Sequence, residues 1–305
     1  MSNRFVALTI LICALWASVG IAIKVCLADA PPLGLAAVRM LLATGTLWLW
    51  LQMRAPPKPD WRYWREVLIA TIFYSVLVAF THIGFDHTSA ARGIVLLNTT
   101  PLFVALLANT VAPREPLNLM KGTGLILAFA GVVAIFANRL QGGGTLLGDG
   151  LMVLAAISWS VQILWTKRAA KGVDPGTLTV VQFFGCTIVL MAASLASESV
   201  TQWHVTPLLV AGIVYLAIAG TVVAWVLWAY VLKNVPASNA SAFIFTVPLF
   251  GMVFSLLLLG ELITLQFAIG AVLVSVGIIV VNRGSVPESA TSARRSPRSK
   301  AATSA

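Results

Sequence analysis

The chain has 305 residues, of which 59% are hydrophobic and 10% are charged, and its mean hydropathy is +0.94. Soluble domains carry about 25% charged residues, so the composition excludes a water-soluble globular protein of this size. The net charge of +10 does not indicate nucleic-acid binding, because the basic residues lie in short loops between apolar runs. We therefore predict an integral membrane protein that contacts the lipid bilayer and no nucleic acid. The three cysteines lack metal-like spacing, so we predict no metal site and no cofactor.

Ten apolar runs are each long enough to cross a bilayer, which takes about 20 residues of helix. The runs lack the alternation of barrel strands, and in lipid only helices and closed barrels satisfy the backbone. The predicted fold class is therefore an all-α membrane protein with ten transmembrane helices. The predicted spans are 5–27, 33–53, 66–85, 91–111, 117–137, 147–168, 176–196, 206–231, 238–259 and 264–282.

The two halves of the chain repeat each other in sequence. WASVGIAIK at 16–24 is echoed by WSVQILWTK at 159–167, with the same spacing from Trp to Lys. An ordered series of matches follows: Pro32 with Pro175, Pro101-Leu102-Phe103 with Pro248-Leu249-Phe250, Glu115 with Glu261, Gly124 with Gly270, and Gly131 with Gly277. We expect a first repeat over 5–137, a second over 147–282, and a disordered cytoplasmic tail over 284–305.

Basic residues gather in the loops on one side of the predicted spans. A cytoplasmic N-terminus leaves only Lys24, Arg92 and Arg139 in outer loops. By the positive-inside rule, we expect both termini in the cytoplasm and the protein in the inner (plasma) membrane. Because each half has five spans, the second copy enters the membrane from the opposite side. Such inverted repeats are a frequent design of secondary transporters.

Several polar side chains fall inside the predicted spans. Arg39 lies about 9 Å below the outer end of span two, at 1.5 Å per residue. A buried arginine often marks a substrate path and can grip a carboxylate, although it could instead snorkel to the interface. Asn98, Thr99 and Gln162 are the other polar candidates, which either bind substrate or bridge helices. His82, at the edge of span three, is expected at the interface.

Aromatic residues and charged residues at helix ends each have two interpretations. Trp16, Trp159 and Phe245 could stack against a planar solute, or they could belong to packing and interfacial belts. Lys24 and Lys167, at helix ends, are expected to snorkel. The first-turn carboxylates favour the positive end of a helix dipole, so capping competes with a gating role at Glu115 and Glu261.

Two prolines and a stripe of small residues predict local helix geometry. Pro101 and Pro248 fall in the middle of spans four and nine, where each should kink its helix. The freed carbonyls could line a central site, or the kinks could be merely tolerated. The glycines at 124 and 131, and those at 270 and 277, predict close helix packing in spans five and ten.

Taken together, these motifs resemble the EamA-type members of the drug/metabolite transporter superfamily. The opening carries Trp16, Ile23-Lys24-Val25, Pro31-Pro32 and Arg39, and each repeat closes with Pro-Leu-Phe, then Glu, then Gly-x6-Gly. The resemblance covers about 5–282 in two copies. It implies ten helices, cytoplasmic termini, and a central cavity approached by Trp16, Arg39, Asn98 and Trp159. One departure is Gln182, which stands where the first half has Arg39.

The leading hypothesis is a secondary transporter that exports small metabolites, such as amino acids or their derivatives, by alternating access. The small-molecule substrate would place its carboxylate on Arg39 or near Asn98 and its apolar part between tryptophans. A cationic multidrug exporter is disfavoured, because no acidic residue falls in the middle of a span. A non-transporting scaffold or sensor is the alternative. A membrane enzyme is disfavoured, because HExxH, GxSxG and clustered acids are missing.

Overall fold

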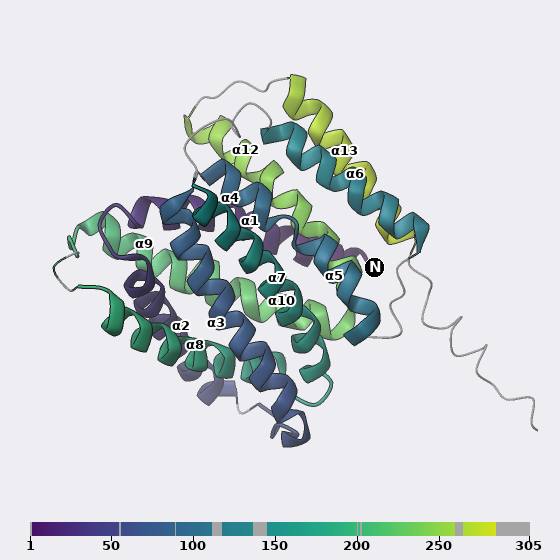
Figure 1. Ribbon diagram of the computed structural model, residues 1–305. Coiled ribbons are helices and arrows are strands. Elements are labelled where there is room, and N and C mark those ends of the chain that lie inside the picture. The colour runs from purple at the N-terminus through teal and green to yellow at the C-terminus, as the bar shows by residue number, and fades with distance from the viewer. Residues whose placement is uncertain are drawn as a thin grey trace, which may run out of the picture.

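The computed structural model describes residues 2–54, 56–88, 90–111, 118–136, 145–199, 201, 203–259 and 265–284. Within these ranges the chain is a bundle of helices without a strand (Figure 1). Six helical segments are long and apolar enough to cross a membrane, and four shorter apolar segments cover the other spans. The prediction of an all-α membrane protein with ten transmembrane helices is confirmed. The predicted tail over 284–305 lies outside the described residues apart from Gly284.

The first half contains spans one to five. They are α1 (Asn3–Cys26), α2 (Pro32–Arg54), α3 (Trp64–His87, preceded by the short 3-10 helix η1, Trp61–Tyr63), α4 (Ala90–Leu97) with α5 (Thr100–Val111), and α6 (Leu119–Phe136). The second half contains spans six to ten. They are α7 (Leu146–Ala169), α8 (Pro175–Ser197), α9 (Pro207–Ala217) with the π-helical η4 (Ile218–Val223) and α10 (Ala224–Asn234), then α11 (Ala237–Ala242) with the 3-10 helix η5 (Phe243–Thr246) and α12 (Val247–Leu259), and α13 (Leu265–Arg283).

Spans five and ten pack against each other as an antiparallel pair, which Figure 1 shows along one side of the bundle. Gly124 lies against the backbone of Gly277 and Gly131 against that of Gly270, so a Cβ atom on Gly124 would stand 2.8 Å from the Gly277 carbonyl oxygen. Gly124 and Gly270 are equivalent positions of the two halves, as are Gly131 and Gly277. Each contact is therefore the symmetric copy of the other.

Spans two and seven form a second antiparallel pair of equivalent helices. The hydroxyls of Thr44 and Thr187, which are equivalent positions, lie 3.2 Å apart. At one end of the pair, the Glu198 carboxylate accepts hydrogen bonds from the Leu33 and Gly34 backbone amides, both at 2.7 Å. Two equivalent helices that run antiparallel must be related by an axis across the bundle. The halves are thus inverted relative to each other, as two five-helix repeats.

The other contacts between the halves follow the same two-fold relation. Span three packs on span six. Span eight, the equivalent of span three, packs on span one, the equivalent of span six. Two ends of the bundle follow from these contacts. We call them the Arg92 end, where α1 and α3 end and α4 and α7 begin, and the Asp60 end, where α2 and α7 end and α3 and α8 begin.

Spans four and nine are interrupted at equivalent places. Asn98 and Thr99 form a turn between α4 and α5, and η5 separates α11 from α12. Pro101 and Pro248 are each the second residue of the helix that follows the interruption. Because proline has no amide hydrogen, the carbonyl four residues earlier loses its partner. In span four that carbonyl, on Leu97, accepts instead from the Thr100 hydroxyl at 2.7 Å.

Candidate substrate site

Three tryptophan rings pack against Trp16, and a tyrosine ring packs against one of them. The ring centroid of Trp16 lies 5.1 Å from that of Trp159, 5.3 Å from Trp225 and 5.2 Å from Trp228. Tyr74 extends the group, with its centroid 4.7 Å from that of Trp225. These separations are typical of favourable aromatic pairs. We call these five residues the aromatic cluster; they come from α1, α3, α7 and α10, and so from both halves.

The aromatic cluster holds hydrogen-bond donors that are not used within the described structure. The indole nitrogens of Trp16, Trp159 and Trp228 are buried and have no acceptor among the described residues. A buried indole N–H usually has a partner, because leaving it unpaired costs free energy. The cluster therefore offers apolar faces together with open donors, which is the chemistry of a binding site for a partly polar organic molecule.

Arg39, on α2, is buried and has only 5% of its surface exposed. Its Nε has no hydrogen-bond acceptor, and it forms no ion pair within the described parts of the chain. The aromatic cluster approaches α2 next to Arg39, where the Tyr74 hydroxyl donates to the sulfur of Met40 at 3.7 Å. An arginine in this state is costly in a membrane protein unless an anion compensates it at some stage. Burial also means that the guanidinium does not reach a lipid interface here.

His82, on α3, is fully buried with 0% exposure, so its expected position at the interface is wrong. Its Nδ1 lies 2.8 Å from the Val78 carbonyl oxygen, one turn earlier in the helix. Its Nε2 is buried without a partner among the residues described, and the ring lies within electrostatic range of Arg39. The hydropathy of α3 did not reveal this burial, because almost every neighbour of His82 in the sequence is apolar.

Asn98 and Thr99 occupy the turn that interrupts span four. The Asn98 Nδ2 donates to the Ile94 carbonyl at 2.8 Å, while its Oδ1 is buried without a described partner. The Thr99 hydroxyl donates to the Leu96 carbonyl at 2.6 Å. Next to them, the Thr100 hydroxyl lies 3.4 Å from the Ala156 carbonyl oxygen, which ties this turn to α7 one turn before Trp159. Asn98 thus keeps an acceptor without a described partner, whereas the Thr99 hydroxyl is used at the end of α4.

Gln162 and Gln182 form a closed polar group between α7 and α8. The Gln162 Nε2 donates to the Gln182 Oε1 and to the Thr166 hydroxyl, each at 2.9 Å, and the Gln182 Nε2 donates to the same hydroxyl at 3.2 Å. Gln182 is the counterpart of Arg39. Its amide is hydrogen-bonded within the second half, whereas the Nε of Arg39 in the first half has no described acceptor. Gln162 bridges helices in this structure and retains one free acceptor, its Oε1, among the described contacts.

The remaining predicted site residues do not join the aromatic cluster. Phe245 is buried in another hydrophobic cluster, where its ring faces Phe129 of α6 at 6.5 Å between centroids. Pro101 and Pro248 shape their helices as described above. The predicted capping or gating residues Glu115 and Glu261 lie outside the described residues.

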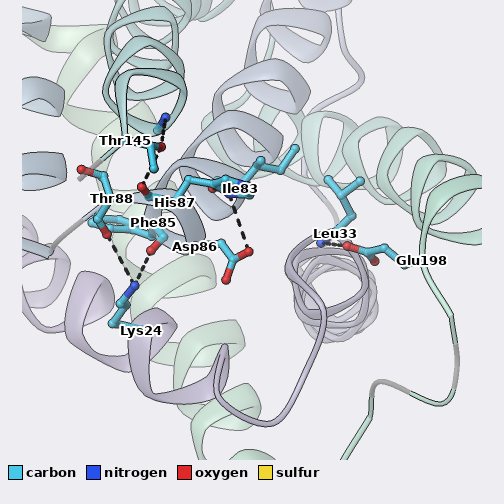
Figure 2. A network of polar contacts seen from close by, with 10 residues as sticks. Lys24, Leu33, Ile83, Phe85, Asp86, His87, Thr88, Thr145 and Glu198 are labelled. Atoms are coloured by element: carbon cyan, nitrogen blue, oxygen red, sulfur yellow. Dashed lines mark hydrogen bonds and ion pairs between the residues drawn. The ribbon is translucent and has the colours of Figure 1, made fainter. Parts of the chain in front are cut away.

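The two repeated lysines hold equivalent helix ends. At the Arg92 end, the Lys24 ammonium donates to the carbonyl oxygens of Phe85 at 2.6 Å and Thr88 at 3.4 Å (Figure 2). At the Asp60 end, the Lys167 ammonium donates to those of Val235 at 2.6 Å and Leu232 at 3.4 Å. A cation at a helix C-terminus interacts favourably with its free carbonyls and dipole. Each lysine therefore fastens the first helix of its half to the third, an arrangement that replaces simple snorkelling.

Within the described part of the chain, one ion pair joins the two halves, and it lies at the Arg92 end. Arg92 of α4 contacts the Asp149 carboxylate of α7 through Nη2 and, at 3.2 Å, through Nε. The Thr88 hydroxyl donates to the same carboxylate at 2.7 Å. The counterparts at the Asp60 end are Asn239 and Val6, which cannot form an ion pair. The two ends of the bundle are thus chemically different.

Comparison with known proteins identifies the fold and the family. The EamA-like transporter family matches residues 4–137 and again residues 146–283. The chain is 32% identical to an "Uncharacterized transporter" of Archaeoglobus fulgidus over 91% of its own length and 96% of that protein. It is 25% identical to a "Probable amino-acid metabolite efflux pump" of Escherichia coli over 92% of its own length and 95% of that protein.

The fold of this chain also matches a solved structure titled "Crystal structure of protein", with a TM-score of 0.78 and 17% sequence identity. The match covers 93% of this chain and 98% of the other. That likeness supports the fold alone. The family matches in both halves cover most of the sequence, and the relatives named above are transporters. This multi-pass membrane protein is a transporter and belongs to the EamA-like transporter family.

Proposed function

We propose that the protein is a secondary transporter of the inner membrane that exports small metabolites with a carboxylate, such as amino acids or their derivatives. In this proposal both termini face the cytoplasm. The substrate places its carboxylate on Arg39 and its apolar part against the aromatic cluster. The "Probable amino-acid metabolite efflux pump" among the relatives is consistent with this substrate class.

The observation that carries the proposal is the state of Arg39. A buried guanidinium without an ion pair in the described chain attracts an anion and repels a cation. Hydrogen bonds that involve a charged group contribute about 1.5–3 kcal/mol each. The aromatic cluster, whose Tyr74 contacts Met40 next to Arg39, would add apolar contact. A solute with a carboxylate at one end and an apolar body at the other fits both features.

Alternating access would use the inverted halves. Each half can adopt the conformation that the other has now, which opens the opposite end of the bundle. The breaks in spans four and nine are places where these helices can bend. In the present structure the Arg92–Asp149 ion pair joins the two halves at the Arg92 end. Opening that end would require this ion pair to separate.

Counterflow in proteoliposomes tests the proposal. Purified protein is reconstituted, and uptake of labelled amino acids and of neutral analogues is compared between wild type and Arg39→Ala. We expect uptake of the carboxylates to fall by about 10-fold to 150-fold, which corresponds to about 1.5–3 kcal/mol, and neutral solutes to change little. Arg54→Ala is the matched control, because Arg54 lies at the exposed end of the same helix and stacks on Trp50.

Equal losses for all solutes would show that Arg39 is structural. Absence of flux with every metabolite tested, in protein that remains folded, would favour a non-transporting scaffold or sensor instead. A metabolite-resistance screen in cells that overproduce the protein supplies the candidate solutes for the assay.

A further inference from the structure

His82 is buried like Arg39 and also has one nitrogen without a described partner, but the two side chains differ in what they can bind. The Val78 carbonyl can only accept, so the 2.8 Å contact requires the proton on Nδ1 of His82. A second positive charge next to a buried guanidinium is unfavourable, which favours a neutral ring. The Nε2 is then a pure acceptor, and it has no donor among the described residues.

The two side chains therefore present complementary chemistry from neighbouring helices. Arg39 of α2 can only donate, whereas the Nε2 of His82 on α3 can only accept. Arg39 is the charged group within electrostatic range of the His82 ring. The equivalent positions of the second half are Gln182, which is already hydrogen-bonded, and Ala229, which has no polar side chain. The donor and acceptor pair thus occurs once, in the first half.

A zwitterionic α-amino acid carries a carboxylate that accepts and an ammonium group that donates, both on its α-carbon. We propose that His82 is a specificity-determining residue, which accepts a hydrogen bond from the substrate ammonium group while Arg39 binds the carboxylate. This inference rests on the proposed function and narrows its substrate class to zwitterionic amino acids with an apolar side chain. A carboxylic acid without the ammonium group would leave the Nε2 unpaired, which costs binding free energy.

The test uses two sets of solutes that differ in one group each. L-Phenylalanine is compared with 3-phenylpropionate and phenethylamine, and L-leucine with 4-methylvalerate and 3-methylbutylamine, in counterflow with the full-length protein. We expect wild type to prefer both amino acids. His82→Leu should lower amino-acid uptake about 10-fold or more while uptake of the two acids stays within about two-fold of wild type.

His87→Leu is the matched control. Its Nδ1 also contacts the carbonyl four residues earlier, that of Ile83 at 3.0 Å, but its side chain is exposed at the end of the same helix. Should His82→Leu not fold, which size-exclusion chromatography would show, His82→Gln keeps an acceptor oxygen and should retain the preference for amino acids over the corresponding acids.

The outcomes separate the two proposals. If amino acids and acids lose uptake equally in His82→Leu, or if His82→Gln loses the preference for amino acids, then His82 does not bind the ammonium group. The proposal that Arg39 binds the carboxylate would be unaffected by that result. If wild type carries the acids as well as the amino acids, the zwitterion preference is refuted. If wild type carries no solute of either set, the proposed substrate class and this inference both fail.

Discussion

A methyl group added to Gly124 should weaken the pair of α6 and α13. The new Cβ would stand 2.8 Å from the Gly277 carbonyl oxygen and 2.8 Å from the Val281 amide nitrogen, both of them backbone atoms. Ordinary contact needs about 3.4 Å or more, so the helices must move apart. Such overpacking costs about 1–3 kcal/mol. The gain in helix propensity from Gly to Ala, about 1 kcal/mol, partly conceals this cost.

Gly122→Ala removes that ambiguity, because Gly122 lies on the same helix and a Cβ there would meet nothing within 4 Å. Both variants gain the same propensity, so the difference between their free energies of unfolding measures the contact alone. We expect Gly124→Ala to be less stable than Gly122→Ala by about 1–3 kcal/mol, in reversible unfolding by sodium dodecyl sulfate in mixed micelles. Equal stability of the two variants would refute the close packing of α6 on α13.

Two further predictions concern the ends of the bundle. Asp149→Asn removes the charge that holds Arg92 and should let a membrane-impermeant thiol reagent, added from the Arg92 end, reach a cysteine introduced at position 100 several-fold faster; an unchanged rate would show that the ion pair does not hold this end closed. Topology reporters fused near Asp60 and Lys171 should lie in the cytoplasm, and one near Gln141 outside; any other pattern would overturn the proposed orientation.

The spans and their pairing could be predicted from the sequence because both depend on long, repeated signals. Hydrophobic runs of about 20 residues leave few alternatives in lipid. The glycines at 124, 131, 270 and 277 recur at the same spacing, and the structure shows them in mutual contact. An odd number of spans per repeat then requires inversion. The repeat boundaries at 5–137 and 147–282 stay predictions.

The candidate site was only partly predictable. Composition cannot tell which face of an apolar helix points inward, so the sequence does not predict the burial of His82, and it groups Phe245 with the tryptophans although its ring pairs with Phe129. The sequence also does not predict the π-helical turn at 218–223, where Gly220 lies against the Val19 side chain. Arg39 was recognisable because a charge within a span is rare, whereas its lack of a described partner required coordinates.

The two self-paired sets of helices, α2 with α8 and α6 with α13, have a consequence for any conformational cycle. When the halves exchange their shapes, a pair made of equivalent members returns to its own arrangement. These four helices can therefore keep their mutual contacts while the contacts among the other spans change. The pair formed by α6 and α13 packs mainly on spans four and nine, so in an alternating-access cycle it would support the interrupted helices at the place where they bend.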